Sequence, residues 1–219
     1  MEQKVNISLS LIESTPTIRR AILQEISKIM TKAIDKATPR ISKDIKQLLK
    51  EALKQEPEYQ SLMSGTLKAE FGIPSSSQVD AVIEAIAETV QIKRTQIATN
   101  NFGVTGGFSL TAMKTDDIGG VINTAQAQVN DAERGYVLPW LEWLLLKNNQ
   151  ILVRNYEVQL TSNPRSRSGM ALMVSSNKNW RVPPEFAGSA SNNWTTRAAS
   201  RIESSVYNII RKHIEAAIP

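Results

Sequence analysis

The chain is 219 residues long with 41% hydrophobic residues, so it can bury a core, and its size predicts one domain. It has no cysteine, which excludes disulfides and thiolate zinc sites, and its longest apolar run, Val137 to Leu146, is too short for a bilayer span of about 20 residues. The net charge of +5 comes from residues 1–54, which hold 11 Lys and Arg against 6 Asp and Glu.

The N-terminal region predicts a strand followed by one long helix. Alternating apolar residues indicate a half-buried strand or an arm over about residues 1–13, and no export signal is evident, so we expect synthesis in a cytoplasm. Ser14-Thr15-Pro16 then supplies a helix cap, and apolar residues recur every three or four positions to about Leu53. Pro39 predicts a kink or a break within this helix.

Such a helix is longer than a compact domain of this size needs. Part of its apolar stripe would then be covered by another subunit, and Ile26 and Ile34 are candidate interface residues. Its Lys and Arg residues fit either a solvated helix face or a surface for nucleic acid or an acidic partner.

Shorter elements are expected in the middle of the chain. Residues 57–63 predict a helix, and residues 66–71 fit either a helical turn or a strand. An insertion over about 74–134 then predicts a helix at 78–89, with Ser77 as its candidate cap, and a hairpin. The hairpin strands are expected at 90–98 and 108–113, with the glycines of 103–107 in its flexible tip.

The last third alternates between helix and strand. Pro139 opens a helix at 140–146, two strands follow at 151–160 and 170–174, and a final helix begins after Asn192 or Asn193. The predicted fold class is therefore α+β, an antiparallel sheet flanked by a long N-terminal helix and a C-terminal helix, in one domain over residues 1–219.

The sequence offers no assembled catalytic, cofactor or metal site. His213, the single histidine, lies in a basic helix end that suits a structural or surface role. Asp116 and Asp117 precede two glycines and are expected in a solvated turn. We therefore predict that the protein is not an enzyme and needs no cofactor, with an unrecognised carboxylate site as a minor alternative.

Two further groups of residues stay open between structural and functional roles. Arg165 and Arg167 stand on a glycine-terminated loop between strands and fit phosphate contact, intersubunit pairing or simple solvation. Trp140, Trp143 and Trp180 fit either a core or a subunit interface, where tryptophan is enriched.

Taken in order, several segments resemble the tail-completion, tail-terminator and head-tail joining (neck) proteins of tailed bacteriophages. The resemblance lies in the basic N-terminal helix, Ser64-Gly65-Thr66-Leu67, the segment Gly135 to Trp143, and Pro183-Pro184-Glu185-Phe186 before the last helix. The family's Thr-Gly-Leu-like turn is only partly kept at 64–67, and the insertion at 74–134 departs from the simplest members.

The resemblance implies a structural virion subunit made in the host cytoplasm. Such subunits form rings, commonly hexamers, that contact adjacent neck or tail proteins while genomic DNA passes through the lumen without sequence-specific binding. Arg165 and Arg167 would then be candidates to face that lumen. The alternative function is a non-specific nucleic-acid-binding protein that uses its basic N-terminal helix, and neither hypothesis places the chain in a membrane.

Overall fold

The computed structural model describes residues 2–10, 16–100, 102–112, 114–131 and 135–219, with the backbone alone for 2–6, 10, 115 and 116. Helices and antiparallel sheets make up 52% and 22% of it, which confirms the predicted α+β class. The chain groups into two compact units. The first unit comprises residues 1–48, 88–114 and 203–219, and the second comprises 49–87 and 115–202. The insertion predicted at about 74–134 contributes residues to both units. That residues 1–219 fold as one domain stays a prediction.

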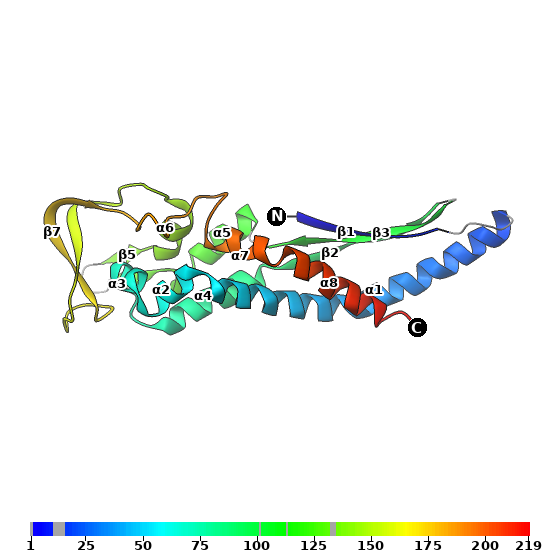
Figure 1. The fold of residues 1–219 in the computed structure, drawn as a ribbon, viewed down its shortest axis with the longest axis horizontal. Coiled ribbons are helices and arrows are strands. Elements are labelled where there is room, and N and C mark those ends of the chain that lie inside the picture. Colours follow the sequence, from blue (N-terminus) through cyan, green and yellow to red (C-terminus); the bar gives the residue numbers. More distant parts are fainter. Residues whose placement is uncertain (1, 11–15, 101, 113, 132–134) are drawn as a thin grey trace. The chain divides into compact units, whose positions relative to one another are not determined.

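The first unit contains a three-stranded antiparallel sheet with β3 in the middle (Figure 1). Strand β1 (Glu2–Ser10) confirms the predicted N-terminal strand and pairs along its whole length with β3 (Gly103–Thr111). Strand β2 (Gln91–Thr99) pairs with the other edge of β3. Strand β3 contributes Val104 and Phe108 to the core, as its central position leads one to expect.

The hairpin between β2 and β3 is confirmed, but its glycines lie elsewhere than predicted. Gly103, Gly106 and Gly107 are part of β3, and the turn forms at Asn100, whose side-chain oxygen accepts hydrogen bonds from the N–H groups of Phe102 and Gly103. The local rule that assigns glycine to turns failed here because pairing with strands on both sides holds this segment extended.

Helix α1 (Pro16–Gln55) is one continuous helix of 40 residues, so the predicted break at Pro39 does not occur. In Figure 1 the helix curves along its length without an interruption. Pro39 is exposed, and the Thr38 hydroxyl donates to the carbonyl of Ile34 at 2.7 Å. Ala37 and Ile41 on either side are buried, so packing holds the helix through the proline. The predicted cap at Ser14 and Thr15 lies outside the described residues.

Helix α8 (Glu203–Glu215) completes the first unit. It buries Val206, Ile210 and Ile214 and ends the chain's regular structure. The sequence predicted one C-terminal helix, whereas the structure has two, because the chain turns at Ile202 between α7 (Trp194–Arg201) and α8.

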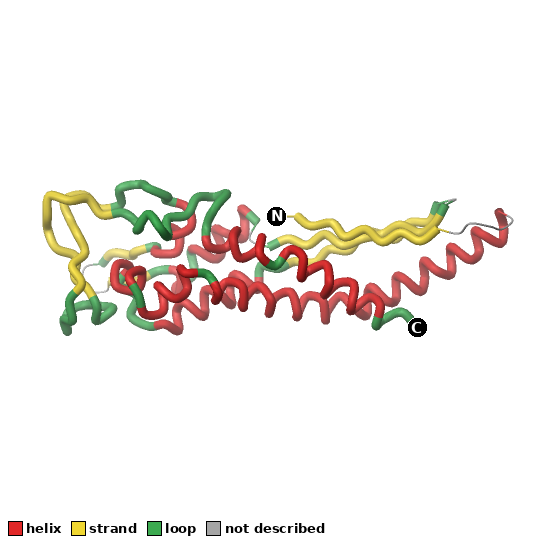
Figure 2. Tube along the Cα trace, in the orientation of Figure 1, coloured by secondary structure: helices red, strands yellow, loops and turns green. Residues whose placement is uncertain are grey.

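The second unit is built mainly of short helices (Figure 2). Helix α2 (Pro57–Ser64) is confirmed, and α3 (Thr66–Phe71) settles the predicted choice between a helical turn and a strand. Its remaining elements are α4 (Ser76–Glu88), α5 (Thr115–Ile122), the short 3-10 helix η1 (Ala125–Ala127), β4 (Val129–Asp131), β5 (Tyr136–Leu138), α6 (Trp140–Leu146), β6 (Val153–Leu160), β7 (Ala171–Trp180) and α7.

Two local predictions in this unit are corrected. The cap of α4 is Ser75, not Ser77, since the Ser75 hydroxyl oxygen accepts from the backbone N–H of Ser77 at 3.2 Å. The pair Asp116 and Asp117 begins helix α5 and is not in a turn, despite the two glycines that follow within the same helix.

Candidate assembly surface

Strands β6 and β7 form a two-stranded antiparallel ribbon, with no third described strand beside it (Figure 2). Residues directly opposite each other in such a ladder share a face, and faces alternate along each strand. The register pairs Tyr156 with Ser175, Val158 with Met173 and Leu160 with Ala171. These residues therefore share one face of the ribbon, which we call the apolar ribbon face.

The apolar ribbon face is largely open to solvent. Leu160 is 68% exposed, Met173 43% and Tyr156 39%. The opposite face is mixed: Glu157 lies across from Val174 and Gln159 across from Leu172, and Glu157 forms an ion pair with Lys178 at 2.7 Å. A ribbon that exposes Tyr156, Leu160 and Met173 on one face has the pattern of a sheet that normally packs against something on that side.

The base of the ribbon is anchored in the core of the second unit. Trp180 pairs with Val153 and accepts the N–H of Leu152 on its carbonyl at 2.9 Å, and its indole N–H donates to Glu70 Oε2 at 2.9 Å. Just beyond the base, Asn155 has a φ of 61° at a register shift, and its N–H donates to the side-chain oxygen of Asn179. The ribbon is thus fixed at one end and twisted near its base by a bulge.

The tryptophans form the core on which this ribbon stands. Trp140 is fully buried, and its indole N–H donates to the carbonyl of Gln126 at 3.0 Å. Trp143 and Trp180 meet edge to face with ring centres 5.6 Å apart, and the Phe71 ring lies 6.1 to 6.5 Å from all three tryptophan rings. Of the two roles left open, the core role therefore holds for Trp140 and Trp180, which are buried within their own unit, while Trp143 is half-buried.

The two candidate arginines both lie on the loop between β6 and β7, but they differ in their contacts. Arg167 forms an ion pair with Asp131 at 2.8 Å, stacks 6.0 Å from the centre of the Tyr136 ring and lies over Gly72. Arg165 is exposed, and its backbone N–H donates to the side-chain oxygen of Asn163 at 2.9 Å. Arg167 is therefore committed within its own subunit, and Arg165 keeps a side chain open to solvent.

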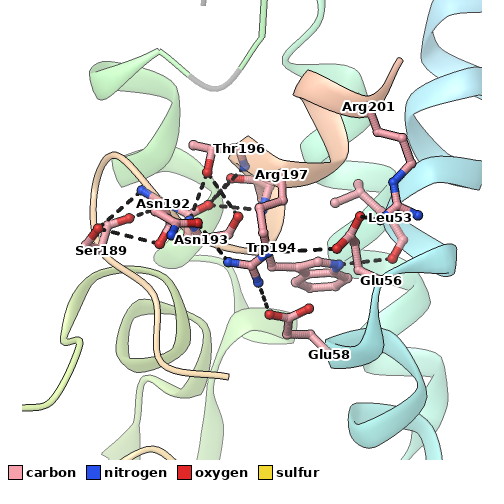
Figure 3. Close-up of polar contacts among 11 residues, drawn as sticks. Leu53, Glu56, Glu58, Ser189, Asn192, Asn193, Trp194, Thr196, Arg197 and Arg201 are labelled. Atoms are coloured by element: carbon pink, nitrogen blue, oxygen red, sulfur yellow. Dashed lines mark hydrogen bonds and ion pairs between the residues drawn. The ribbon is translucent and has the colours of Figure 1, made fainter. Parts of the chain in front are cut away.

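A polar network holds α7 against the corner between α1 and α2 (Figure 3). Glu56 and Glu58, on either side of Pro57, are buried, and Arg197 pairs with both of them. Arg201 pairs with Glu56 at 2.8 Å, and the buried indole N–H of Trp194 donates to the Leu53 carbonyl at 3.0 Å. Both guanidinium groups pair with carboxylates of this corner, so the network ties α7 to the α1–α2 corner.

Asn193 caps α7 and so sets its start, as predicted for this position. Its side-chain oxygen accepts from the backbone N–H groups of Thr195 and Thr196 at 3.0 and 3.1 Å and from the Thr195 hydroxyl at 2.7 Å (Figure 3). The Thr196 hydroxyl oxygen accepts the Asn193 N–H in return at 2.8 Å, which completes a capping box.

Burial raises the pKa of two carboxyl groups in this unit, Glu58 and Glu70. For Glu58 the nearby Arg197 opposes the effect of burial, and for Glu70 the hydrogen bond from Trp180 opposes it. Each group accepts from a donor of its own unit, Glu58 Oε1 from Arg197 and Glu70 Oε2 from the Trp180 indole, while Glu58 Oε2 is buried without a hydrogen-bond partner among the described residues.

The remaining candidate residues lie in the first unit. Ile34 is buried at 1% exposure, so it belongs to the core, whereas Ile26 is half-buried. Ile34 is among the side chains that line an apolar pocket of about 450 Å³ between the sheet, α1 and α8. His213 Nε2 lies 2.7 Å from Asp44 Oδ2, so the single histidine joins α8 to α1, in agreement with the predicted structural role.

The described part of the chain holds no group of three or more His, Cys, Asp or Glu side chains arranged to bind a metal ion. Within the same described residues, no helix has the length and apolar character that crossing a membrane requires. The ribbon residues Tyr156, Leu160 and Met173 were missed as candidates; alternation with polar residues is visible in the sequence around Tyr156 and Leu160, but not around Met173, which stands between Leu172 and Val174. No family model, no curated protein and no solved structure matches this chain.

Proposed function

We propose that the protein is a structural virion subunit of a tailed phage that self-assembles into a ring at the neck or tail end. The observation that carries this proposal is the exposed apolar ribbon face on a ribbon whose base is locked into a tryptophan core. An isolated two-stranded ribbon is marginally stable in water, so an additional surface that covers its apolar face stabilises it. The next copy of the chain supplies that surface.

The contact is heterologous, because the ribbon face packs against a different surface of the neighbour. Contacts of this kind generate closed rings when the rotation between copies closes, and filaments when it does not. The order of weak motifs that resembles the neck and tail proteins supports the ring, of which a hexamer is the common form. We place the ring in the virion, in contact with adjacent neck or tail proteins and with genomic DNA passing through its lumen.

Of the two arginines that the proposal assigns to the lumen, one is already engaged within its own subunit. Arg167 is held by Asp131 and Tyr136, so Arg165 is the arginine of the loop that remains open to solvent. One such cation from each copy of a ring makes a belt of charge that attracts phosphates without reading bases.

The test compares two neighbouring positions on opposite faces of β6. Leu160→Asp places a charge on the apolar ribbon face, whereas Gln159→Asp places the same charge on the opposite face, where a polar side chain already stands. We expect the unmodified chain and Gln159→Asp to show the mass of a closed oligomer by light scattering and rings in negative-stain images. Leu160→Asp should be monomeric with an unchanged circular dichroism spectrum. A monomeric unmodified chain at micromolar concentration, or a full-size oligomer of Leu160→Asp, would refute the proposal.

A further inference from the structure

The exposed side of α1 carries a row of cations in the first unit. We name Lys32, Lys36, Arg40 and Lys43 the basic stripe; all four are exposed. At 3.6 residues per turn these positions fall within about 80° of the helix circumference and span about 17 Å of its length. No acidic side chain among the described residues forms an ion pair with any of them.

The cations that follow on the same side of α1 all have partners on α4. In the first unit Lys46 pairs with Glu88 at 2.5 Å. In the second unit Lys50 pairs with Glu84, and Lys54 pairs with Asp80 at 2.9 Å. Along both helices the paired residues are four positions apart, so α4 presents a ladder of carboxylates to a ladder of lysines.

The α4 ladder ends at Glu88, the last residue of that helix, and does not reach the basic stripe. The strand that follows, β2, brings Lys93 and Arg94, and Arg94 takes Asp35 of α1 as its partner. Lys28, on the other side of the stripe, is paired with Glu25 at 3.0 Å. The chain therefore pairs the cations at both ends of this side of α1, whereas the two acids that stand beside the stripe, Asp35 and Asp44, pair with Arg94 and His213 and not with the stripe.

We propose that the basic stripe is the docking surface for an acidic amphipathic helix of another protein, with carboxylates at every fourth position as on α4. Ile18 and Ile22, which precede Lys32 by 14 and 10 positions, are 56% and 40% exposed on the same side of α1, so a partner helix that extends past Lys28 also covers apolar residues. This inference concerns a different surface from the apolar ribbon face and stands whether or not the chain forms rings.

The pairing of α1 lysines with α4 carboxylates favours an acidic helix over duplex DNA as the partner of the basic stripe. The stripe's cations rise about 6 Å per four residues, which is the spacing that another helix offers with acids at i and i+4. Exposed ion pairs contribute little each, so the contact is weak when measured alone and weakens with salt.

The experiment measures binding of the full chain to a defined peptide by fluorescence anisotropy at low salt. The probe is a capped alanine-based helix of about 16 residues with Glu at every fourth position and Leu three residues after each Glu; its control has Gln in place of Glu. A second probe is a 20-base-pair DNA duplex. The stripe variant replaces Lys32, Lys36 and Arg40 with Gln. The matched variant replaces Arg154, Arg181 and Lys212 with Gln, and so removes the same charge from exposed positions elsewhere.

We expect the Glu peptide to bind more tightly than the Gln peptide and than the duplex. The stripe variant should lose about tenfold in affinity for it, since three exposed pairs are removed, while the matched variant keeps the affinity of the unmodified chain. Equal binding of both peptides, or no binding, would show a solvated helix face. Tighter binding of the duplex that is lost in the stripe variant would assign the stripe to nucleic acid. Loss of oligomer mass in the stripe variant would identify the partner as a second copy. Each of these three results overturns the inference.

Discussion

The burial and ion pairing of a single carboxyl group can depend on residues that are distant in the sequence. Glu58 follows the proline that opens α2 and looks like an ordinary first-turn acid in the sequence. In the structure it is fully buried and paired with Arg197, which lies 139 residues away. No periodicity in the sequence indicates this pairing, because it depends on how α7 packs and not on any local pattern.

Glu70 gives a prediction about pH. Burial raises its pKa above the ordinary value of 4.5, so in that range the folded state binds more protons than the unfolded state, and this residue's contribution to stability falls as the pH rises. Glu70→Gln keeps an oxygen to accept the Trp180 N–H but cannot ionise. We expect its melting temperature, relative to the unmodified chain, to increase between pH 4.5 and pH 7.5 in scanning calorimetry.

Glu157→Gln is the control for this measurement. The hydrogen bond from Lys178 lowers the pKa of Glu157, so its ionised form favours the folded state above the ordinary pKa and loses that effect as the pH falls. The relative melting temperature of Glu157→Gln should therefore decrease as the pH rises. Parallel curves for Glu70→Gln and the unmodified chain would contradict the assignment for Glu70.

Helices and strands were more predictable than single contacts. The amphipathic pattern from Ile18 to Leu53 and the capping signal at Asn193 each involve neighbours in sequence, and both elements formed where expected. The break at Pro39, one of two outcomes predicted there, did not form, and the glycines of β3 lie in a strand and not in a turn, because buried neighbours and flanking strands outweigh one residue's preference. The ribbon strands were predicted, but its open apolar face was not, since alternation alone does not say whether a face is covered.

Asn193 offers a prediction for the start of α7. Asn193→Ala removes an oxygen that accepts two backbone N–H groups of the first turn, and we expect it to lower the free energy of unfolding by about 1–2 kcal/mol in urea titrations. Asn193→Asp keeps the acceptor and should lose much less. If the two variants were equally destabilised, the donor contact from the Asn193 amide to the Ser189 carbonyl would be the more important one.

At the scale of the whole molecule, pairing between distant segments was beyond sequence reasoning. Alternation predicted an N-terminal strand or arm. Its partner, β3, lies about a hundred residues later, and the sequence predicted for β3 only the pairing with the other hairpin strand. The grouping into two units is equally non-local, since the first unit combines three separate segments of the chain. Length and composition carry no information about such groupings.

Deletion of residues 2–10 tests whether β1 is a strand of the fold or a dispensable arm. Without it, β3 would lose its partner on one side and expose a new sheet edge. We expect the melting temperature to fall by about 10 °C or more, given that each kcal/mol corresponds to about 2–4 °C in a chain of this size. A synthetic peptide of residues 2–10, added in excess, should restore part of the loss. An unchanged melting temperature would make β1 an arm.

The pairing of β1 with β3 also governs the order in which the first unit forms on the ribosome. The residues of β1 are made first, but Thr111, at the far end of their partner strand, is added about 100 residues later, which takes about 5–20 s at ordinary rates of synthesis. Helix α1 depends on local contacts and forms within microseconds once its residues emerge. The hairpin of β2 and β3 closes next, because its loop is short. The strand that is synthesised first is therefore the last to join the sheet.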